Sequence, residues 1–270
     1  MQPEIAKQIL EKNKEDWEYL TDEFAVSRAS NWPEIKPLIK YVKSGDRILD
    51  LGCGNGRLFT LFQSANVEYT GLDSCERLIE AARKNFQFPI SNFQTNSKFQ
   101  IPNSKPQFIV SSALNLPFKN EEFDVIFSIA VFHHIPSNLF RERVLAECYR
   151  VLKPGGYLIL TTWNLWQPKL LLKYKIWQTF ALRAMSLLRI TNPLQIYKLR
   201  IRDWDWGDVF IPWKERKGTI YRYYHIFTFK ELKKIIKNAG FGIIDNYYTR
   251  RGGGKTNLLT AYNLAVVAQK

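Results

Sequence analysis

The feature that most constrains this chain is a glycine-rich turn at the end of a short apolar run. Residues 47–51, Arg-Ile-Leu-Asp-Leu, lead directly into Gly-Cys-Gly-Asn-Gly. Glycine has no Cβ and readily adopts positive φ angles, so the alternating residues Gly52, Gly54 and Gly56 allow the backbone to come close to a ligand. A strand followed by such a turn predicts a loop that binds a cofactor.

A second apolar run follows this turn and ends in an acid. Residues 67–72 predict a strand, and Asp73 comes directly after it. That spacing is close to the one at which a nucleotide-binding βαβ unit places a carboxylate on the ribose hydroxyl groups. Residues 58–64 predict the connecting helix, whose N-terminal N–H groups favour a ligand carboxylate. The glycines do not follow the G-x-G-x-x-G spacing of dinucleotide-binding enzymes.

The form Asp-x-Gly-x-Gly-x-Gly, which begins at Asp50, resembles motif I of the class I S-adenosylmethionine-dependent methyltransferases. The resemblance implies that S-adenosylmethionine (SAM) is the cofactor, that the three glycines lie against it, and that Asp73 binds its ribose. For Asp50 two interpretations remain open. It orients the loop or the cofactor's ammonium group, or its role is purely structural.

Residues 111–118, Ser-Ser-Ala-Leu-Asn-Leu-Pro-Phe, resemble the segment that binds adenine in these methyltransferases. The resemblance implies cofactor contacts from Ser112, Ala113 and Leu114, and from Ile129 at the end of the next apolar run. The family usually has an aspartate in the place of Ser112. A hydroxyl group accepts hydrogen bonds less strongly than a carboxylate, so we expect weaker binding of the adenine amino group.

Helix and strand signals alternate along much of the chain, which predicts an α/β fold with a doubly wound, Rossmann-like sheet. The resemblance adds an N-terminal helical lid, from which Tyr19 and Arg28 reach the cofactor, although helix packing and a surface position explain these two residues equally well. The predicted helices cover residues 3–20, 33–42, 74–84, 140–151 and 169–190, and the further predicted strands cover residues 108–110, 123–130, 157–160 and 262–268.

We expect a single methyltransferase domain over residues 1–270. Its predicted parts are N-terminal helices (1–45), a cofactor-binding core (46–162), a basic helical insertion (163–220) and the C-terminal part of the sheet (221–270).

Two adjacent histidines, His133 and His134, follow the fourth predicted strand, where open α/β sheets bind ligands. Imidazole titrates near neutrality, so one of them is a candidate general base, and a structural or cofactor-lining role is the alternative. We expect no metal site, because adjacent side chains on a strand diverge and no third ligand is nearby. The three cysteines have no C-x-x-C spacing, which indicates neither a disulfide framework nor a zinc site and fits a reducing cytoplasm.

The chain is strongly basic, with a net charge of +14 and a pI near 9.6. This charge favours a polyanionic partner, with solubility alone as the alternative. Residues 148–202 contain no Asp or Glu, and the predicted basic amphipathic helix at 169–190 suits an anionic membrane, a nucleic acid, or docking on the sheet. The N-terminus has no signal peptide, and no apolar run approaches the ~18 residues of a membrane span, so we expect a cytoplasmic protein without stable membrane insertion.

Later segments narrow the resemblance to the tRNA methyltransferases that act on 5-carboxymethyluridine at the wobble position. The implied product is the methyl ester of that carboxylate, and the implied partners are tRNA and a small zinc-binding activator protein. A cation must hold the carboxylate, and we assign this role to Arg222, with Tyr223 and His225 completing the pocket. The alternative for all three residues is a packed polar cluster that bridges a strand and a helix. The segments that carry the resemblance are residues 113–118, 128–134, 208–213 and 222–227, together with Ser27-Arg28, Trp32-Pro33, Trp163 and Gln167.

Two other functions remain open. The first is methylation of a lipid-like small molecule, such as a quinone precursor, at a membrane surface, with His134 or His225 as the base that a hydroxyl or carbon acid requires. The second is a non-catalytic RNA-binding subunit with the same fold. Residues 165–202 and the glycine-rich residues 250–260 follow no family pattern that we can place.

Overall fold

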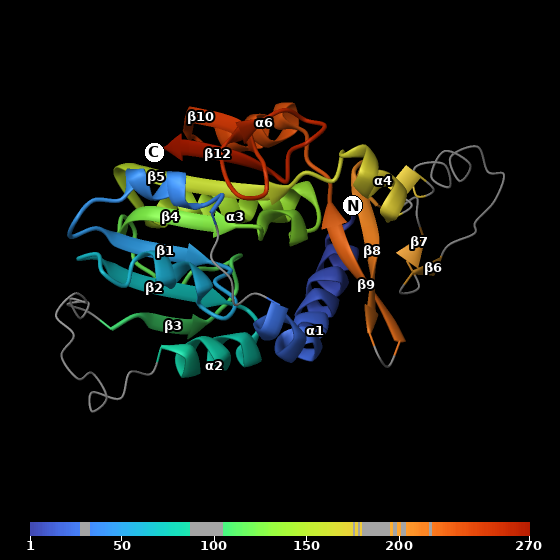
Figure 1. Ribbon diagram of the computed structural model, residues 1–270, viewed down its shortest axis with the longest axis horizontal. Coiled ribbons are helices and arrows are strands. Elements are labelled where there is room, and N and C mark those ends of the chain that lie inside the picture. The colour runs from blue at the N-terminus through green and yellow to red at the C-terminus, as the bar shows by residue number, and fades with distance from the viewer. Residues whose placement is uncertain are drawn as a thin grey trace.

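The main feature of the computed structural model is an eight-stranded sheet with the strand order β11-β10-β12-β5-β4-β1-β2-β3 (Figure 1). The structure describes residues 1–27, 33–86, 105–174, 176–177, 179, 195–196, 199–200, 204–215 and 218–270. The five strands from β3 to β5 are parallel, and β12 runs antiparallel to both β5 and β10. The strands are β1 (Arg47–Leu51), β2 (Glu68–Asp73), β3 (Gln107–Val110), β4 (Phe123–Ile129), β5 (Leu152–Trp163), β10 (Gly242–Thr249), β11 (Lys255–Thr256) and β12 (Asn263–Gln269).

Helices cover both faces of this sheet, so the predicted doubly wound architecture is confirmed. On one face α3 (Asn138–Val151) and α6 (Phe229–Asn238) bury apolar side chains such as Leu145 and Ile236. On the other face α2 (Glu76–Asn85) packs with two 3₁₀ helices, η1 (Lys36–Tyr41) and η2 (Arg57–Leu61). The strands between these two apolar layers are nearly continuous hydrophobic runs, as expected for parallel strands that are buried on both faces.

The predicted helix at residues 58–64 is only the short 3₁₀ helix η2. The backbone N–H groups of Phe59, Phe62 and Ala65 each bond the carbonyl three residues earlier, at Gly56, Phe59 and Phe62. This i to i−3 repeat winds the chain too tightly for an α-helix. The segment after Pro33 likewise forms a turn and then η1 instead of a continuous helix.

A two-stranded antiparallel ribbon, β8 (Asp208–Glu215) and β9 (Gly218–His225), is separate from the main sheet. Figure 1 shows the long helix α1 (Pro3–Ser27) between the sheet and this ribbon. The predicted C-terminal part of the sheet, residues 221–270, therefore begins with the end of the ribbon strand β9 and with α6, and the sheet itself resumes at β10.

The basic insertion is described only in part. It includes the short helix α4 (Pro168–Lys173) and the strand pair β6 (Gln195–Ile196) and β7 (Leu199–Arg200). Residues 175, 178 and 180–194, where most of the predicted basic helix falls, lie outside the described residues. None of the helices in the described part of the chain combines the length and apolar character that a membrane crossing requires.

Candidate cofactor and substrate site

A cavity of about 430 Å³ lies at the carboxyl ends of the parallel strands. Its volume falls within the range of roughly 300–1,000 Å³ that is usual for ligand sites. Each of the strands β1 to β4 contributes its last residue or the residue that follows it, and open α/β sheets bind ligands at this edge. These contributions are Gly52 after β1, Asp73 of β2, Val110 of β3 and Ile129 of β4.

The glycine turn forms one wall of the cavity. Gly52 and Gly54 line it with φ angles of +76° and +55°, in the left-handed region that favours glycine. A Cβ on Gly52 would lie 2.4 Å from Cγ2 of Val131, so a side chain there would collide with the opposite wall. Gly56 is not part of the wall. A Cβ at Gly56 would instead meet the ring of Phe86 at 2.8 Å, so this glycine serves packing behind the turn.

The two acids that follow β1 and β2 have different positions. Asp73 lines the cavity and accepts hydrogen bonds from the N–H groups of Gly54 (2.9 Å) and Cys75 (3.0 Å). Burial raises the pKa of Asp73 above its ordinary value, although these backbone hydrogen bonds oppose the shift. Asp50 is buried behind the turn, outside the cavity wall, and accepts a hydrogen bond of 2.5 Å from the hydroxyl group of Tyr69. Of its two predicted roles, this position favours support of the loop.

Residues of the predicted adenine segment also line the cavity. Ser112, Ala113 and Leu114 form this part of the wall, together with Ile129. The Ser112 hydroxyl oxygen accepts a hydrogen bond from the N–H of Leu114 at 3.2 Å, so one of its two lone pairs is already used. The other lone pair and the hydroxyl proton remain for a ligand.

The residues present fit SAM. The glycine turn gives close backbone approach, the Asp73 carboxylate suits a ribose diol, and the segment from Ser112 to Leu114 suits a purine edge. The polar groups lie around an otherwise apolar wall, as in most nucleotide-like cofactor sites.

Helix α1 lies over the cavity. Leu10, Asn13, Lys14 and Trp17 line it, at the i, i+3, i+4, i+7 spacing of one helix face. The side-chain amide of Asn13 donates to the carbonyl of His134 at 3.0 Å, which fixes the helix to the end of β4. Tyr19, by contrast, is 51% exposed and outside the wall. Arg28 lies outside the described residues.

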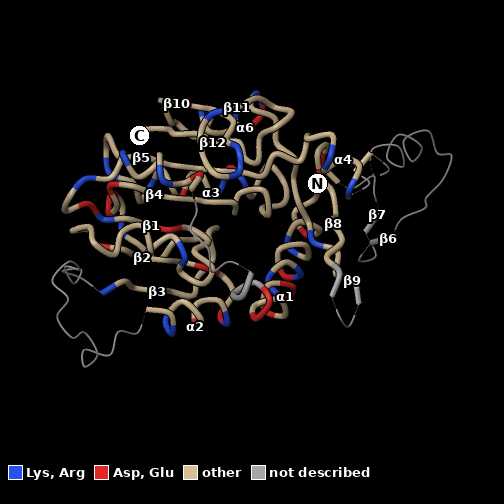
Figure 2. Tube along the Cα trace, in the orientation of Figure 1, with Lys and Arg blue, Asp and Glu red and all other residues tan. Residues whose placement is uncertain are grey.

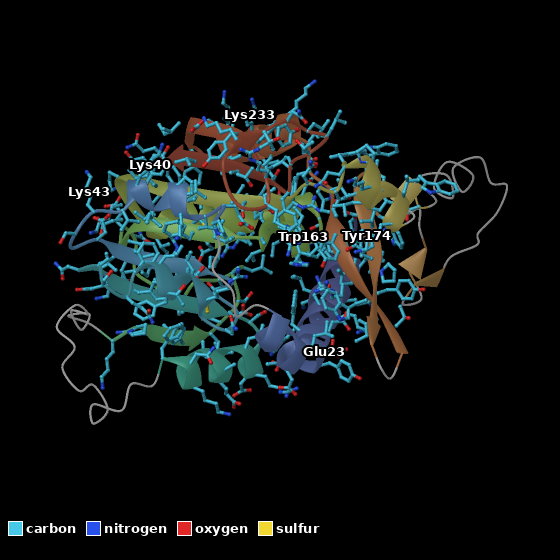
Figure 3. All side chains as sticks on the ribbon, viewed as in Figure 1. Glu23, Lys40, Lys43, Trp163, Tyr174 and Lys233 are labelled. Carbon is cyan, nitrogen blue, oxygen red and sulfur yellow. The ribbon has the colours of Figure 1, made fainter. Side chains whose placement is uncertain are left out.

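The end of the cavity nearest the ribbon is aromatic. Figure 3 shows Trp163 where the sheet faces the ribbon. Its ring stacks on Tyr224 of β9 with centroids 5.3 Å apart, and Trp17 of α1 meets His134 edge to face at 5.6 Å. These four side chains and Tyr262 line the cavity. Stacked rings of this kind accept a planar aromatic ligand such as a nucleobase.

His134 is a neutral acceptor in this wall. Its Nδ1 lies 3.2 Å from the carbonyl oxygen of Tyr223, and a carbonyl only accepts, so Nδ1 carries the proton and Nε2 has the free lone pair. Burial, assisted by the charge of Arg222, lowers the pKa of His134 to about 3. A base this weak removes protons poorly at neutral pH.

Strand alternation separates the three residues that were predicted to bind the substrate carboxylate. Successive side chains of a strand point to opposite faces, so Arg222 and Tyr224 share one face of β9, and Tyr223 and His225 share the other. Arg222 is 4% exposed, and its guanidinium carbon lies 4.8 Å from the ring centre of Trp17 and 5.4 Å from that of Tyr224. Two of its ring neighbours are thus part of the cavity wall.

The Arg222 guanidinium is packed among aromatic rings, the third being Trp213 at 4.4 Å. Within the described residues it makes neither a hydrogen bond nor an ion pair, and its Nε atom is buried. The buried carboxylate of Asp16 is near enough for the charge of Arg222 to oppose the rise that burial causes in its pKa, but it forms no ion pair with the guanidinium. A buried cation without a paired anion is costly, so this position favours an anionic ligand.

Tyr223 and His225 lie in a buried polar network outside the cavity wall. The Tyr223 hydroxyl donates to Oδ1 of Asp208 at 2.6 Å and accepts from Nη2 of Arg141 at 2.8 Å. His225 places Nδ1 2.7 Å from Oδ1 of Asp208 and Nε2 2.8 Å from Oε1 of Glu231. These contacts join the ribbon to α3 and α6, so both residues support the site from behind.

Several wall residues were missed from the sequence. Trp17 lies in the helix predicted at residues 3–20 but was not predicted to line the site, although its spacing from Leu10 and Lys14 was the available signal. Tyr224 and Tyr262 come from the ribbon and from the turn before β12, and nothing in their local sequence shows that these two segments meet.

Comparison with known proteins identifies the family. Residues 49–160 match the family model of a methyltransferase domain. A solved SAM-dependent methyltransferase from Methanosarcina mazei is 25% identical and aligns over 87% of this chain and 96% of its own, with a TM-score of 0.63. Residues 49–160 therefore form a methyltransferase domain, and the fold is that of a SAM-dependent methyltransferase. SAM is therefore the cofactor that the cavity of this methyltransferase is built to hold.

Relatives of the methyltransferase include proteins that act on tRNA. A tRNA (carboxymethyluridine(34)-5-O)-methyltransferase from Arabidopsis thaliana is 30% identical over 161 residues, which are 60% of this chain and 34% of that protein. Another of the same name, from Schizosaccharomyces pombe, is 25% identical over 87% of this chain and 90% of its own length. The chain spans between 27% and 34% of the first four curated relatives that it matches.

Proposed function

We propose that the protein transfers the methyl group of SAM to the carboxylate of 5-carboxymethyluridine at the wobble position of tRNA, forming the methyl ester. The observation that carries this proposal is the buried Arg222 guanidinium, which packs against two rings of the cavity wall without itself lining the cavity, and whose Nε atom makes no hydrogen bond. A planar guanidinium binds a carboxylate through two parallel hydrogen bonds. The names of the relatives support the same substrate.

The reaction requires little of the protein beyond positioning the substrate carboxylate relative to the methyl group. A carboxylate with a pKa of about 4 is ionised at neutral pH and needs no general base. When bound, SAM supplies a methyl group on a positively charged sulfur. The protein holds the nucleophile in line with that methyl group, through Arg222 on the carboxylate and the rings of Trp163 and Tyr224 on the base.

The lack of a strong base in the described wall argues against a hydroxyl or carbon-acid substrate, as a quinone precursor would be. His134 has a pKa of about 3, because it is buried and close to Arg222. His225 has both ring nitrogens on carboxylates and lies outside the wall. The cofactor wall, which includes Gly52, Gly54 and Asp73, in turn argues against a non-catalytic subunit. The need for a zinc-binding activator and a cytoplasmic location stay predictions from the sequence.

Nucleoside mass spectrometry of tRNA from cells with and without the protein tests this function. We expect the deletion to remove the methyl ester and to accumulate 5-carboxymethyluridine. An unchanged amount of the methyl ester would refute the proposal. This measurement covers the activator as well, because the cell supplies any partner that the reaction needs.

Arg222→Ala should lower kcat/KM for tRNA roughly 10- to 150-fold, since a hydrogen-bonded charge contributes about 1.5–3 kcal/mol and each 1.4 kcal/mol is a factor of ten. Arg222→Lys keeps the charge without the planar guanidinium, so its activity should lie between that of the wild type and that of Arg222→Ala. Calorimetry should show unchanged SAM affinity in both variants, and thermal unfolding should show that both fold. Full turnover in a folded Arg222→Ala variant would remove Arg222 from the mechanism.

A further inference from the structure

We propose that two basic surface segments beside the cavity form one RNA-binding surface, which carries the nucleotides on either side of the target uridine. This inference rests on the proposed function. The surface, called the basic rim below, consists of exposed residues of α4 and of the loop around β11. Its members are Lys169, Lys173, Arg250, Arg251 and Lys255.

Buried hydrogen bonds join these two segments, although more than 70 residues separate them in the sequence. The side-chain amide of Asn164 donates to the carbonyl groups of Leu258 (2.7 Å) and Ala261 (3.1 Å). The Asn164 backbone N–H donates to the carbonyl of Tyr262 at 2.9 Å, and the Gln167 amide also bonds Ala261. The start of α4 and the end of the loop are thus held as one unit.

This unit continues directly from the wall of the cavity. Trp163 precedes Asn164 in the chain, and Tyr262 follows Ala261, and both rings line the cavity. The loop also packs against the N-terminal segment, where a Cβ on Gly253 would lie 3.1 Å from the carbonyl oxygen of Pro33. The basic rim is therefore joined through short stretches of chain to two rings of the cavity wall.

The charge of the rim suits a phosphate backbone. Residues 148–202 and 246–270 contain no acid, and Figure 2 shows Lys and Arg on α4 and around β11. Of the five rim residues, Lys255 contacts a carboxylate, that of Asp245 at 3.4 Å. When a base enters the cavity, the phosphates on either side of its nucleotide stay at the opening. Lys and Arg side chains that bind these phosphates release the counterions of the RNA.

The aromatic wall favours RNA over an anionic membrane as the occupant. Sequence-specific RNA recognition unstacks single-stranded bases onto aromatic side chains, and the two rim segments continue from aromatic residues of such a pocket. The rim also exposes two apolar side chains, Leu172 (69% exposed) and Leu259 (64% exposed). Unstacked neighbouring bases offer apolar faces for these leucines, whereas a flat bilayer surface would leave the cavity unused.

The test is tRNA binding by the triple variant Lys169→Gln, Lys173→Gln and Arg251→Gln, with a transcribed tRNA as the probe over a range of salt concentrations. The matched control is Lys43→Gln, Lys84→Gln and Lys119→Gln, which removes the same charge at the amino ends of the strands, opposite the cavity. Figure 3 shows Lys43 at the end of the molecule away from the ribbon. SAM affinity and thermal unfolding serve as checks on folding.

We expect the rim variant to lose at least tenfold in affinity, and the slope of log K against log salt to fall by about 2, since each lost phosphate contact contributes about 0.7 for single strands. The control should bind like the wild type. Three results would overturn the proposal. The rim variant could bind tRNA like the wild type, or the control variant could lose as much tRNA affinity as the rim variant. The third is a rim variant that keeps its tRNA affinity and loses only its flotation with anionic vesicles. If the rim variant loses tRNA affinity but cells that contain the protein make no methyl ester, the RNA-binding surface is supported and only the proposed reaction is refuted.

Discussion

At the scale of single residues, Asp50 shows how a buried acid links folding to pH. Burial raises its pKa to about 7, and the hydrogen bond from Tyr69 only partly opposes this. In the unfolded chain an aspartate releases its proton near pH 3.9. Between these two values the folded state holds a proton that the unfolded state has lost, so this group makes stability fall as pH rises from about 4 to about 7.

Asp50→Asn removes that titration and keeps an acceptor oxygen for Tyr69. The free energy of unfolding of the variant, relative to the wild type, should therefore increase with pH across this window, by on the order of 1.4 kcal/mol per pH unit. Urea unfolding at several pH values measures it. A constant difference between the two proteins would show that Asp50 does not hold its proton.

Sequence alone predicted the cofactor side of the site better than the substrate side. Gly52, Gly54, Asp73 and Ser112 stand at or just after strand ends, and parallel strands bring their carboxyl ends to one edge, so their positions follow from the strand pattern. The substrate side depends on how a hairpin docks. Side chains alternate between the two faces of β9, so Arg222 lies behind the aromatic wall and His225 lies in a buried network. The periodicity of the sequence does not show which face of a ribbon meets the sheet.

At the scale of elements, helix α1 supplies the cap that α2 lacks. The N-cap residue of α2, Cys75, makes no side-chain capping bond. Instead Glu18 of α1 accepts from the N–H groups of Glu76 (2.7 Å) and Arg77 (3.1 Å), and the Arg77 side chain donates to the Glu18 carbonyl at 2.7 Å. The same contact holds α1 over the cavity.

Glu18→Ala should lower the free energy of unfolding by about 0.5–2 kcal/mol, the usual effect of losing an N-cap. It should also weaken SAM binding, because Trp17 and Asn13 line the cavity from the same helix. Glu15→Ala, an exposed residue on that helix, is the control. Equal stability and equal SAM affinity in the two variants would mean that the inter-helix cap does not position α1.

The predictions of helices and strands were correct where they depend only on the spacing of apolar residues within one segment. The strands β1 to β5 and β12 and the helices α1, α2 and α3 follow from apolar spacing, whereas α6 and β10 were not predicted. The 3₁₀ helix η2 does not follow from spacing either, because the tight turn at residues 52–56 sets the winding of the residues directly after it. The ribbon strands look like any other strands in sequence. Their separation from the main sheet depends on contacts with α1 and α3, which are distant in the chain.

At the scale of the whole molecule, one buried carboxylate links the ribbon to α3 and, through His225, to α6. Asp208 lies in the ribbon, and its partners include Arg141 of α3, Tyr223 of the ribbon and His225, which in turn contacts Glu231 of α6. Arg141 is fully buried. The position of the ribbon face that carries Arg222 and Tyr224 depends on this network.

Asp208→Ala leaves the Arg141 charge buried with less compensation, so the free energy of unfolding should fall by about 3–5 kcal/mol. Turnover should fall in the fraction that still folds, because the ribbon is displaced. Asp245→Ala, which removes the exposed pair with Lys255, should cost at most about 1 kcal/mol. Similar losses for both variants in urea unfolding would contradict this role of Asp208.

The position of β12 inside the sheet also sets the order in which the parts of the cavity form while the chain is being synthesised. This strand lies between β10 and β5, and the Tyr262 and Asn263 positions of the cavity stand at its start. During synthesis, the glycine turn, Asp73 and the adenine segment leave the ribosome long before that strand exists. A nascent chain can therefore shape its nucleotide wall early, yet the aromatic pocket stays unfinished until β12 inserts, so an incomplete chain would lack the pocket that selects the acceptor.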